Sequence, residues 1–176
     1  MLRRAVFLDR DGVINRSLER DGRPYAPTSL AEFEILPGVA ESLLELRRCG
    51  YLNIVVTNQP DIKTGKQSPE VLQVMHERLL GGLALDAIQV CPHTDEDACP
   101  CRKPQPGMLF DAEQNFKIDL KASWMVGDRW RDIAAGQAAG CRCCFVDHGY
   151  TERQPEPPFH RVTSLPEAVA LIVGQT

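Results

Sequence analysis

Short apolar segments that alternate with amphipathic ones constrain the fold of this chain more than any other feature. Apolar runs typical of buried β-strands occur at residues 5–8, 52–56, 87–90, 123–126 and 143–146. Helical patterns occur at residues 38–50, 68–82, 106–116, 134–140 and 164–173. Strands that alternate with helices form a parallel sheet with right-handed crossovers and helices on its faces. We therefore predict an α/β fold with a doubly wound, Rossmann-like parallel sheet, in a single domain that spans residues 1–176.

Polar residues directly follow four of these predicted strands. They are Asp9, Thr57, Cys91 and Asp128. In open parallel sheets, ligands bind outside the carboxyl ends of the strands. We therefore expect these four positions to meet at one edge of the sheet. Residues 12–36, between the first strand and the first helix, are predicted to form a long loop, and loops of that length are often functional.

Composition indicates an ordinary globular protein and argues against several other classes. The net charge is −4 and the Lys and Arg residues are scattered along the chain, which argues against a nucleic-acid partner. No apolar run approaches the roughly 18 residues that a membrane span requires. The apolar run after Met1-Leu2-Arg3-Arg4 is too short for an export signal. We therefore expect a cytoplasmic monomer that binds neither membrane nor nucleic acid.

Asp9 and Asp11 carry the strongest chemical signal in the chain. Two carboxylates at the end of one strand repel each other, and they favour a bound cation, especially next to a phosphate. We expect Asp9 to attack phosphorus, and Asp11 to protonate the leaving oxygen and then deprotonate water. A Mg²⁺ held by Asp9 and Asp128 would offset the repulsion between the nucleophile and a phosphate dianion. The simpler alternative, an Asp-Gly turn, leaves Lys103 and Asp128 without a role.

Four motifs in this order resemble those of the haloacid dehalogenase superfamily of phosphotransferases. They are Asp9-x-Asp11-Gly12, Thr57 at a strand end, Arg102-Lys103-Pro104, and Gly127-Asp128-x-x-x-Asp132. The match covers residues 5–150, although Val13 replaces the Thr that usually follows the Gly.

The resemblance implies further roles around the two carboxylates. Thr57 would donate a hydrogen bond to a phosphoryl oxygen, and Lys103 would place a positive charge beside it. The backbone carbonyl of Asp11 would join Asp9 and Asp128 as a Mg²⁺ ligand. Two roles stay open for Asp132, which either binds the metal directly or braces the loop through the backbone or Lys103.

A second group of metal-ligating residues lies in the segment 91–101. Cys91-Pro92-His93 and Cys99-Pro100-Cys101 place four soft ligands in two close pairs. This set suits tetrahedral Zn²⁺ with every position filled by protein, so we predict a structural zinc site formed by Cys91, His93, Cys99 and Cys101. The alternative is a set of reduced thiols without metal. We expect Cys49, Cys141, Cys143 and Cys144 to be packing residues.

The zinc segment, Arg102-Lys103-Pro104 and Pro106-Gly107-Met108 resemble the subfamily of histidinol-phosphate and heptose-bisphosphate phosphatases. Pro-Gly-Met favours the heptose branch, which serves the synthesis of lipopolysaccharide and other surface glycans. The resemblance implies no large cap domain. It implies a phosphorylated sugar as substrate, bound by Asn15, Asn58, Gln59, Pro60, Arg102 and Arg129, with Tyr25 as a further candidate.

One position departs from the heptose pattern and keeps alternatives open. Thr64 stands where an Arg is usual, and Lys63 or Lys66 either replaces its charge or lies in a solvated loop. A histidinol-phosphate phosphatase is the nearest alternative. A non-catalytic, zinc-stabilised binding domain is an alternative of a different class.

Overall fold

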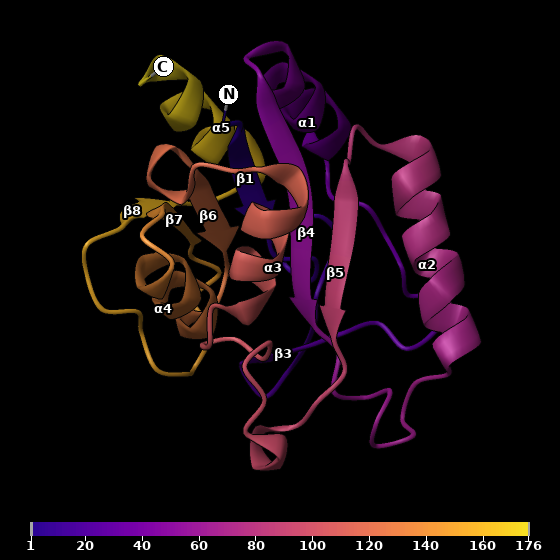
Figure 1. The fold of residues 1–176 in the computed structure, drawn as a ribbon. Helices are drawn as coiled ribbons and strands as arrows, with labels where there is room; N and C mark the ends of the chain where they lie inside the picture. Colours follow the sequence, from indigo (N-terminus) through magenta and orange to yellow (C-terminus); the bar gives the residue numbers. More distant parts are fainter. Residues whose placement is uncertain (1, 176) are drawn as a thin grey trace.

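A six-stranded, fully parallel sheet forms the centre of the computed structural model, which describes residues 2–175. The strand order is β5-β4-β1-β6-β7-β8 (Figure 1). The strands are β1 (Arg4–Leu8), β4 (Tyr51–Asn58), β5 (Ala87–Cys91), β6 (Trp124–Gly127), β7 (Arg142–Val146) and β8 (His160–Val162). The helices are α1 (Val39–Arg48), α2 (Pro69–Gly82), α3 (Gly107–Phe116), α4 (Trp130–Ala138) and α5 (Leu165–Gly174). The predicted α/β parallel sheet is confirmed, without a large cap domain.

Two hydrophobic cores lie on opposite faces of this sheet. In β1, Val6 and Leu8 pack on the side of α1 and α5, whereas Ala5 and Phe7 pack on the side of α3 and α4. Successive side chains of a strand point to opposite faces, so a strand buried on both faces is apolar at every position. This explains why the apolar run of β1 does not alternate with polar residues.

Local sequence signals set the start of α2 as expected. Ser68 is the N-cap and its Oγ accepts a hydrogen bond from the backbone N–H of Val71, while Pro69 occupies the first helical position. The side chain thereby satisfies one of the N–H groups that a helix start leaves unpaired.

The structure corrects the prediction of a long loop over residues 12–36. A hairpin lies within it, formed by β2 (Leu18–Arg20) and β3 (Arg23–Tyr25). The turn residues Asp21 and Gly22 have φ angles of 52° and 71°, which suit a tight Asp-Gly hairpin turn. The hairpin was not predicted because its strands are only three residues long and because a proline such as Pro24 is unfavourable within a strand.

Two further strand assignments differ from the sequence prediction. Thr57 is the penultimate residue of β4 rather than the residue after it, because β4 pairs with β5 as far as Asn58. The short edge strand β8 was not predicted; its residues pair with β7 after a proline-rich segment. Three residues at a sheet edge carry too little apolar pattern to identify a strand.

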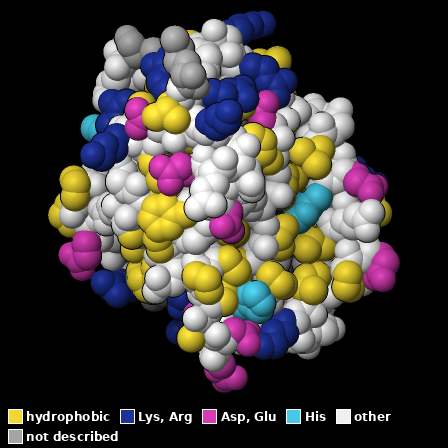
Figure 2. Space-filling model, viewed as in Figure 1, with side chains coloured by type: hydrophobic (Ala, Val, Ile, Leu, Met, Phe, Trp, Pro, Cys, Tyr) yellow, Lys and Arg dark blue, Asp and Glu magenta, His cyan; other side chains and the backbone are white. Residues whose placement is uncertain are grey.

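The face shown in Figure 2 distributes charge less evenly than the sequence suggested. Lys and Arg side chains gather at the upper end, near the chain termini of Figure 1, and acidic side chains are spread over the rest. The strands β1, β4, β5 and β6 run away from that end (Figure 1). The basic region therefore lies opposite the sheet edge where the predicted site residues lie. Within residues 2–175, no helix has the length and apolarity that crossing a membrane requires.

Candidate active site

Three buried carboxylates converge at the carboxyl edge of the sheet. Asp9 follows β1, Asp128 follows β6, and Asp132 lies in the first turn of α4. One oxygen of each lies within 4.8 Å of the others. All three residues are buried, and together they form what we call the carboxylate cluster. The parallel sheet thus assembles the cluster from positions up to 123 residues apart in sequence.

Lys103 is the cation at the centre of the carboxylate cluster. Its Nζ lies 2.8 Å from Oδ1 of Asp9 and 2.6 Å from Oδ1 of Asp132, and it donates to the carbonyl oxygen of Val56 at 2.7 Å. Burial alone would lower the pKa of Lys103, but the charges of Asp132 and Asp9 outweigh it and raise the pKa. Lys103 is therefore a fixed positive charge beside Asp9.

One ammonium group does not neutralise three carboxylates. Burial, followed by repulsion from Asp132, raises the pKa of Asp9 to about 6. Burial and the charges of Asp9 and Asp132 raise the pKa of Asp128 well above its ordinary value. Both carboxylate oxygens of Asp128 are buried without a regular hydrogen bond. An excess of buried negative charge and unpaired carboxylate oxygens is the donor set that a hard divalent cation requires.

Asp132 has the bracing contacts that the sequence left as one of two alternatives. Its Oδ1 contacts Lys103, and its Oδ2 accepts a hydrogen bond from the backbone N–H of Arg129 at 2.9 Å. Both oxygens are therefore engaged within the protein, whereas Asp128 has no hydrogen bond of regular geometry and only a contact with the Tyr150 hydroxyl. The geometry favours Asp128 over Asp132 as a ligand for a cation.

The side chain of Asp11 is not one of the three in the carboxylate cluster and is held by a separate network. Arg10 donates to it through Nε at 3.0 Å and through Nη2 at 2.8 Å and 3.1 Å. Asn15 donates to Oδ1 at 2.9 Å, and Gln59 donates to Oδ2 at 2.8 Å. The backbone carbonyl of Asp11 accepts no hydrogen bond from residues 2–175. The Asp11 carboxyl group is thus held in one orientation, and its carbonyl oxygen is free for another ligand.

Arg10 and His76 are site residues that the sequence analysis missed. Arg10 is fully buried, and its Nη1 lies 3.1 Å from Nε2 of His76 in α2. Burial and the positive charge of Arg10 lower the pKa of His76 to about 4, so the imidazole is neutral near pH 7. An Arg between two aspartates suggests a solvated side chain in sequence, and only the fold shows that it is enclosed.

The structure places three of the predicted contact residues behind the pocket rather than on its surface. Asn15 and Gln59 are fully buried, and their amides bind Asp11. Thr57 is also buried, and its Oγ1 accepts a hydrogen bond from Gln59 at 2.8 Å. None of the three lines the pocket. The expected substrate contacts of Asn15 and Gln59 are therefore replaced by contacts to Asp11.

The pocket above the carboxylate cluster has a volume of about 360 Å³. The predicted residues Asp9, Asp11, Asn58, Pro60, Arg102, Lys103, Asp128 and Arg129 line it, together with Tyr25. Arginines 23 and 131 and Asp95 also line it and were not predicted. The pocket thus has an acidic floor and several guanidinium groups on its walls.

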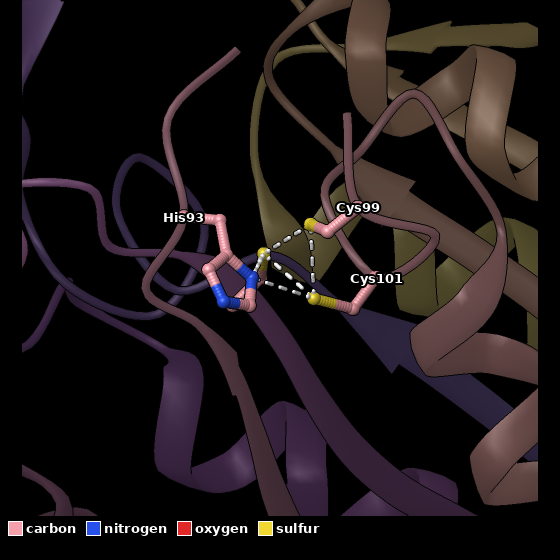
Figure 3. Close-up of side chains that lie close together, drawn as sticks. His93, Cys99 and Cys101 are labelled. Atoms are coloured by element: carbon pink, nitrogen blue, oxygen red, sulfur yellow. Dashed lines mark hydrogen bonds between the residues drawn. The ribbon is translucent and has the colours of Figure 1, made fainter. Parts of the chain in front are cut away.

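The four predicted zinc ligands come together at the end of β5. Contacts among Cys91, His93, Cys99 and Cys101 join Sγ atoms and the Nδ1 of His93 at 2.8–3.6 Å (Figure 3). Ligands at about 2.0–2.3 Å from a tetrahedral metal lie at similar separations from one another. The group fits one tetrahedral ion. Cys141, Cys143 and Cys144 are buried in the two cores, as expected of packing residues.

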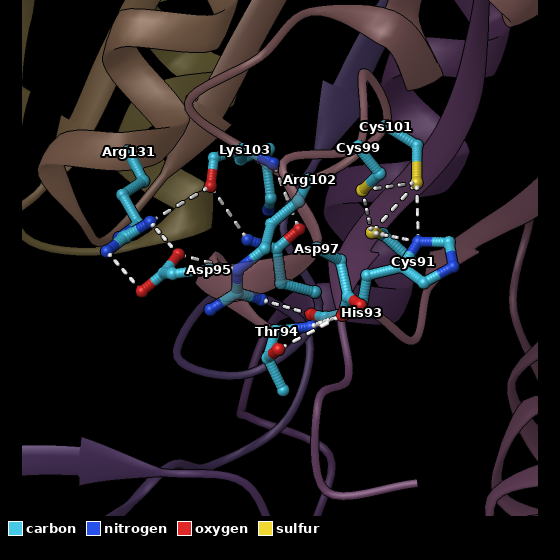
Figure 4. Close-up of polar contacts among 11 residues, drawn as sticks. Cys91, His93, Thr94, Asp95, Asp97, Cys99, Cys101, Arg102, Lys103 and Arg131 are labelled. Carbon is cyan, nitrogen blue, oxygen red and sulfur yellow. Dashed lines mark hydrogen bonds and ion pairs between the residues drawn. The ribbon is translucent and has the colours of Figure 1, made fainter. Parts of the chain in front are cut away.

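The segment 91–101, which we call the cysteine–histidine loop, also orients pocket residues. Nη1 of Arg102 donates to the carbonyl oxygen of His93 at 3.0 Å, and the next residue is Lys103 (Figure 4). Lys63, one candidate for a replacement charge, instead pairs with Asp97 of the same loop. Lys66 and Thr64 do not line the pocket. The 60–66 loop therefore contributes no lysine to the pocket wall.

Gly12 is required by the close approach of the backbone to Asp128. Its φ is +88°, and a Cβ there would lie 2.0 Å from Oδ2 of Asp128. We expect Gly12→Ala to lower the free energy of unfolding by about 3 kcal/mol or more, from strain and the clash together. Gly140 is the matched control, since its φ is +84° but a Cβ would meet nothing within 4 Å. Equal losses for both variants in urea unfolding would show that the clash is absent.

Comparison with known proteins places this arrangement in a family. The model of the HAD-hydrolase-like family matches residues 100–168. A D-glycero-beta-D-manno-heptose-1,7-bisphosphate 7-phosphatase of Pseudomonas aeruginosa is 35% identical over 179 residues, covering 99% of this chain and 98% of the relative. The chain belongs to the HAD-like phosphatase family. A Photorhabdus laumondii relative of the same name is 40% identical over 147 residues, covering 77% of this chain and 75% of the relative.

Solved structures agree with the family assignment. The D,D-heptose 1,7-bisphosphate phosphatase of B. bronchiseptica, complexed with magnesium and phosphate, superposes with a TM-score of 0.84 at 28% identity. It covers 98% of this chain and 99% of its own. The corresponding protein of Burkholderia thailandensis gives a TM-score of 0.70 at 26% identity, covering 97% and 99%. This HAD-like phosphatase is thus a phosphoric monoester hydrolase, and the non-catalytic alternative has no support.

Proposed function

We propose that this HAD-like phosphatase removes the 7-phosphate from D-glycero-D-manno-heptose 1,7-bisphosphate. The observation that carries the proposal is the 35% identity over the full length of the P. aeruginosa relative of that name. The pocket supports it, because guanidinium groups surround a carboxylate cluster and suit a substrate with more than one anionic group.

Asp9 is the proposed nucleophile. Lys103 binds Oδ1 of Asp9, and Oδ2 accepts no hydrogen bond from residues 2–175. Oδ2 is thus available to attack phosphorus, which forms an aspartyl-phosphate as the bond to the sugar oxygen breaks. Lys103 keeps Asp9 oriented and places positive charge beside the transferring phosphoryl group.

Asp11 is the proposed proton carrier. It donates a proton to the leaving sugar oxygen and then accepts one from the water that hydrolyses the aspartyl-phosphate. Arg10, Asn15 and Gln59 hold its carboxyl group in place for both steps. Fixed orientation of a proton donor is what makes such transfers efficient.

We propose Mg²⁺ at the carboxylate cluster and Zn²⁺ at the cysteine–histidine loop. Asp9, Asp128 and the backbone carbonyl of Asp11 would hold Mg²⁺, and the unpaired oxygens of Asp128 support this assignment. When bound, Mg²⁺ reduces the repulsion between the nucleophile and the phosphate dianion. Zn²⁺ would be held by Cys91, His93, Cys99 and Cys101. It would be a structural ion, because protein ligands fill all four tetrahedral positions.

We also propose that residues 1–176 form one monomeric domain in the cytoplasm. One continuous sheet with a core on each face supports a single domain. Seven free cysteines, four of them gathered as metal ligands, are typical of a reducing compartment.

Mg²⁺ affinity should depend on pH through Asp9. Without metal, protonated Asp9 contributes to the free energy of unfolding, because its pKa is higher in the folded than in the unfolded protein. This contribution is complete below about pH 4 and is lost as pH rises through about 6. Mg²⁺ requires the ionised carboxylate, so its affinity should fall about tenfold per pH unit below pH 6. Calorimetric titration with Mg²⁺ at pH 5, 6 and 7 measures this, and a pH-independent affinity would contradict the assignment of Asp9 as a ligand.

A phosphatase screen tests the substrate. The panel contains both anomers of heptose 1,7-bisphosphate, histidinol phosphate and common sugar monophosphates, assayed by phosphate release with and without Mg²⁺. We expect heptose bisphosphate to have the highest kcat/KM. A preference for histidinol phosphate would replace the sugar substrate, and no Mg²⁺-dependent release from any ester would refute the proposed chemistry.

A further inference from the structure

The pocket wall contains a pair of arginines held by one carboxylate, which the proposed chemistry does not use. Asp95, in the cysteine–histidine loop, accepts a hydrogen bond from Nε of Arg102 at 2.8 Å. It also accepts from Nη1 and Nη2 of Arg131 in α4, at 2.7 Å and 3.0 Å. Figure 4 shows Asp95 between the two guanidinium groups. We call these three residues the Arg–Asp–Arg group.

The Arg–Asp–Arg group lies beside the carboxylate cluster but apart from it. Nη1 of Arg131 lies 3.4 Å from the backbone carbonyl oxygen of Lys103, whereas the side chain of Lys103 extends to Asp9. All three members line the same pocket as Asp9. A substrate whose reacting phosphate lies at Asp9 therefore has the Arg–Asp–Arg group in the same cavity. The two places are separated by the length of the Lys103 side chain.

The charge of the group favours an anion. Two guanidinium ions and one carboxylate leave a net charge of +1. Nη2 of Arg102 and Nε of Arg131 donate no hydrogen bond to residues 2–175. Arg131 also lies in the first turn of α4, where the helix dipole disfavours a cation and favours an anion. Asp95 already offsets part of this cost, and the open donors leave a place for a further anionic group.

The existing ion pairs do not prevent such binding. The Asp95 side chain is 61% exposed, and exposed ion pairs contribute only about 0.2–1 kcal/mol. A phosphate dianion offers more charge and more acceptor oxygens than a single carboxylate, and it matches the planar fork of a guanidinium. Asp95 can therefore orient Arg131 before the substrate binds. When a phosphate is bound, Arg131 can donate some of these hydrogen bonds to it instead.

Arg131 is not the only further basic side chain at the pocket. Arg23 of β3 lines it too, but it is exposed and no contact within residues 2–175 fixes its guanidinium. Two other basic side chains are engaged elsewhere. Arg129 forms a bidentate ion pair with Glu152, through contacts of 2.6 to 3.2 Å. Lys63 pairs with Asp97 and does not line the pocket. Arg131 thus has both features that an anion site requires. Asp95 fixes its position next to Arg102, and its Nε is free to donate a hydrogen bond.

We propose that Arg131 is a specificity-determining residue that binds a second phosphate of the substrate, remote from the one hydrolysed, and that Asp95 is its positioning residue. The inference rests on the proposed function, since it concerns the substrate of the same site. It assigns recognition of the second phosphate of that bisphosphate to Arg131, next to Arg102.

The test compares Arg131→Gln with the native enzyme on two substrates, heptose 1,7-bisphosphate and heptose 7-phosphate. We expect KM for the bisphosphate to rise about 10- to 100-fold with kcat nearly unchanged, because a charge-assisted bidentate contact is lost. The kcat/KM for the monophosphate should stay within about twofold, since it has no group at this position. Arg131→Lys should give an intermediate KM, because charge remains but the fork is lost.

Arg153→Gln is the matched control. Both Arg131 and Arg153 lie over the ring of Trp130, at 5.0 Å and 4.5 Å, but Arg153 does not line the pocket. We expect Arg153→Gln to change neither kcat/KM value by more than about twofold. Equal losses of Arg131→Gln on both substrates would show a structural role and overturn the inference.

Failure of the inference and failure of the proposed function give different results. If heptose bisphosphate is not hydrolysed, fructose 1,6-bisphosphate and fructose 6-phosphate serve as the paired probes. A native enzyme that hydrolyses monophosphates as well as bisphosphates overturns the inference and leaves phosphatase chemistry intact. An enzyme that releases phosphate from neither class overturns the proposed function.

Discussion

Replacement of Asp9 by Asn should lower kcat by on the order of 10⁴-fold or more, because a neutral amide cannot attack phosphorus. The fold should persist, since Lys103 keeps its contact with Asp132 at 2.6 Å. One buried charge is also removed from a cluster in which burial, followed by repulsion from Asp132, raises the pKa of Asp9 to about 6. The metal-free variant should therefore unfold at the same temperature as the native protein or higher. Phosphate release and thermal unfolding measure the two effects.

Asp111→Asn provides the control for this experiment. Asp111 is an exposed residue of α3, and its replacement should change neither kcat nor the unfolding temperature. Residual activity of Asp9→Asn above about 1% would contradict the assignment of the nucleophile. A large loss of stability in Asp9→Asn would contradict the electrostatic account of the carboxylate cluster.

Replacement of Cys101 by Ser should remove zinc, lower stability and reduce turnover. The native protein should contain one zinc ion per chain, and Cys101→Ser should contain far less. Loss of a structural zinc should lower the unfolding temperature by about 10 °C, because metal binding contributes directly to folding. Turnover should fall at least about tenfold, since Arg102 and Lys103 follow the last ligand directly. Metal analysis, thermal unfolding and phosphate release test these three expectations.

Cys49→Ser is the matched control for the zinc experiment. Cys49 lies at the end of α1, outside the group of four ligands, and its carbonyl rather than its thiol binds Arg4. This variant should keep its zinc and its activity. Native protein without zinc would refute the metal assignment, and a zinc-free Cys101→Ser of normal turnover would refute the link between the loop and Lys103.

Chemistry-bearing residues at strand ends were predictable because the parallel sheet itself determines where they meet. Asp9 and Asp128 directly follow apolar runs, and parallel strands bring such positions to one edge. The grouping of the Cys and His residues of the cysteine–histidine loop was predictable for a different reason. They lie within eleven residues, so their spacing alone restricts how they can be arranged.

Short strands and side-chain directions were not predictable in the same way. The hairpin of β2 and β3 has three residues in each strand, and a proline obscured its pattern. Asn15 and Gln59 were expected at the substrate, but they bind Asp11 from inside the protein. A polar residue near a site can face the ligand or support a catalytic group, and sequence does not distinguish the two.

The sequence by itself determined the α/β class, the proximity of Asp9 to Asp128 and Lys103, and the grouping of Cys91, His93, Cys99 and Cys101. These follow from periodicity, from strand ends and from local spacing. Only the tertiary structure decided that Arg10 is enclosed beside His76 and that Asp95 joins Arg102 to Arg131. The physical reason is that the Arg10–His76 and Asp95–Arg131 contacts join segments 66 and 36 residues apart, and their meeting depends on the path of the whole backbone.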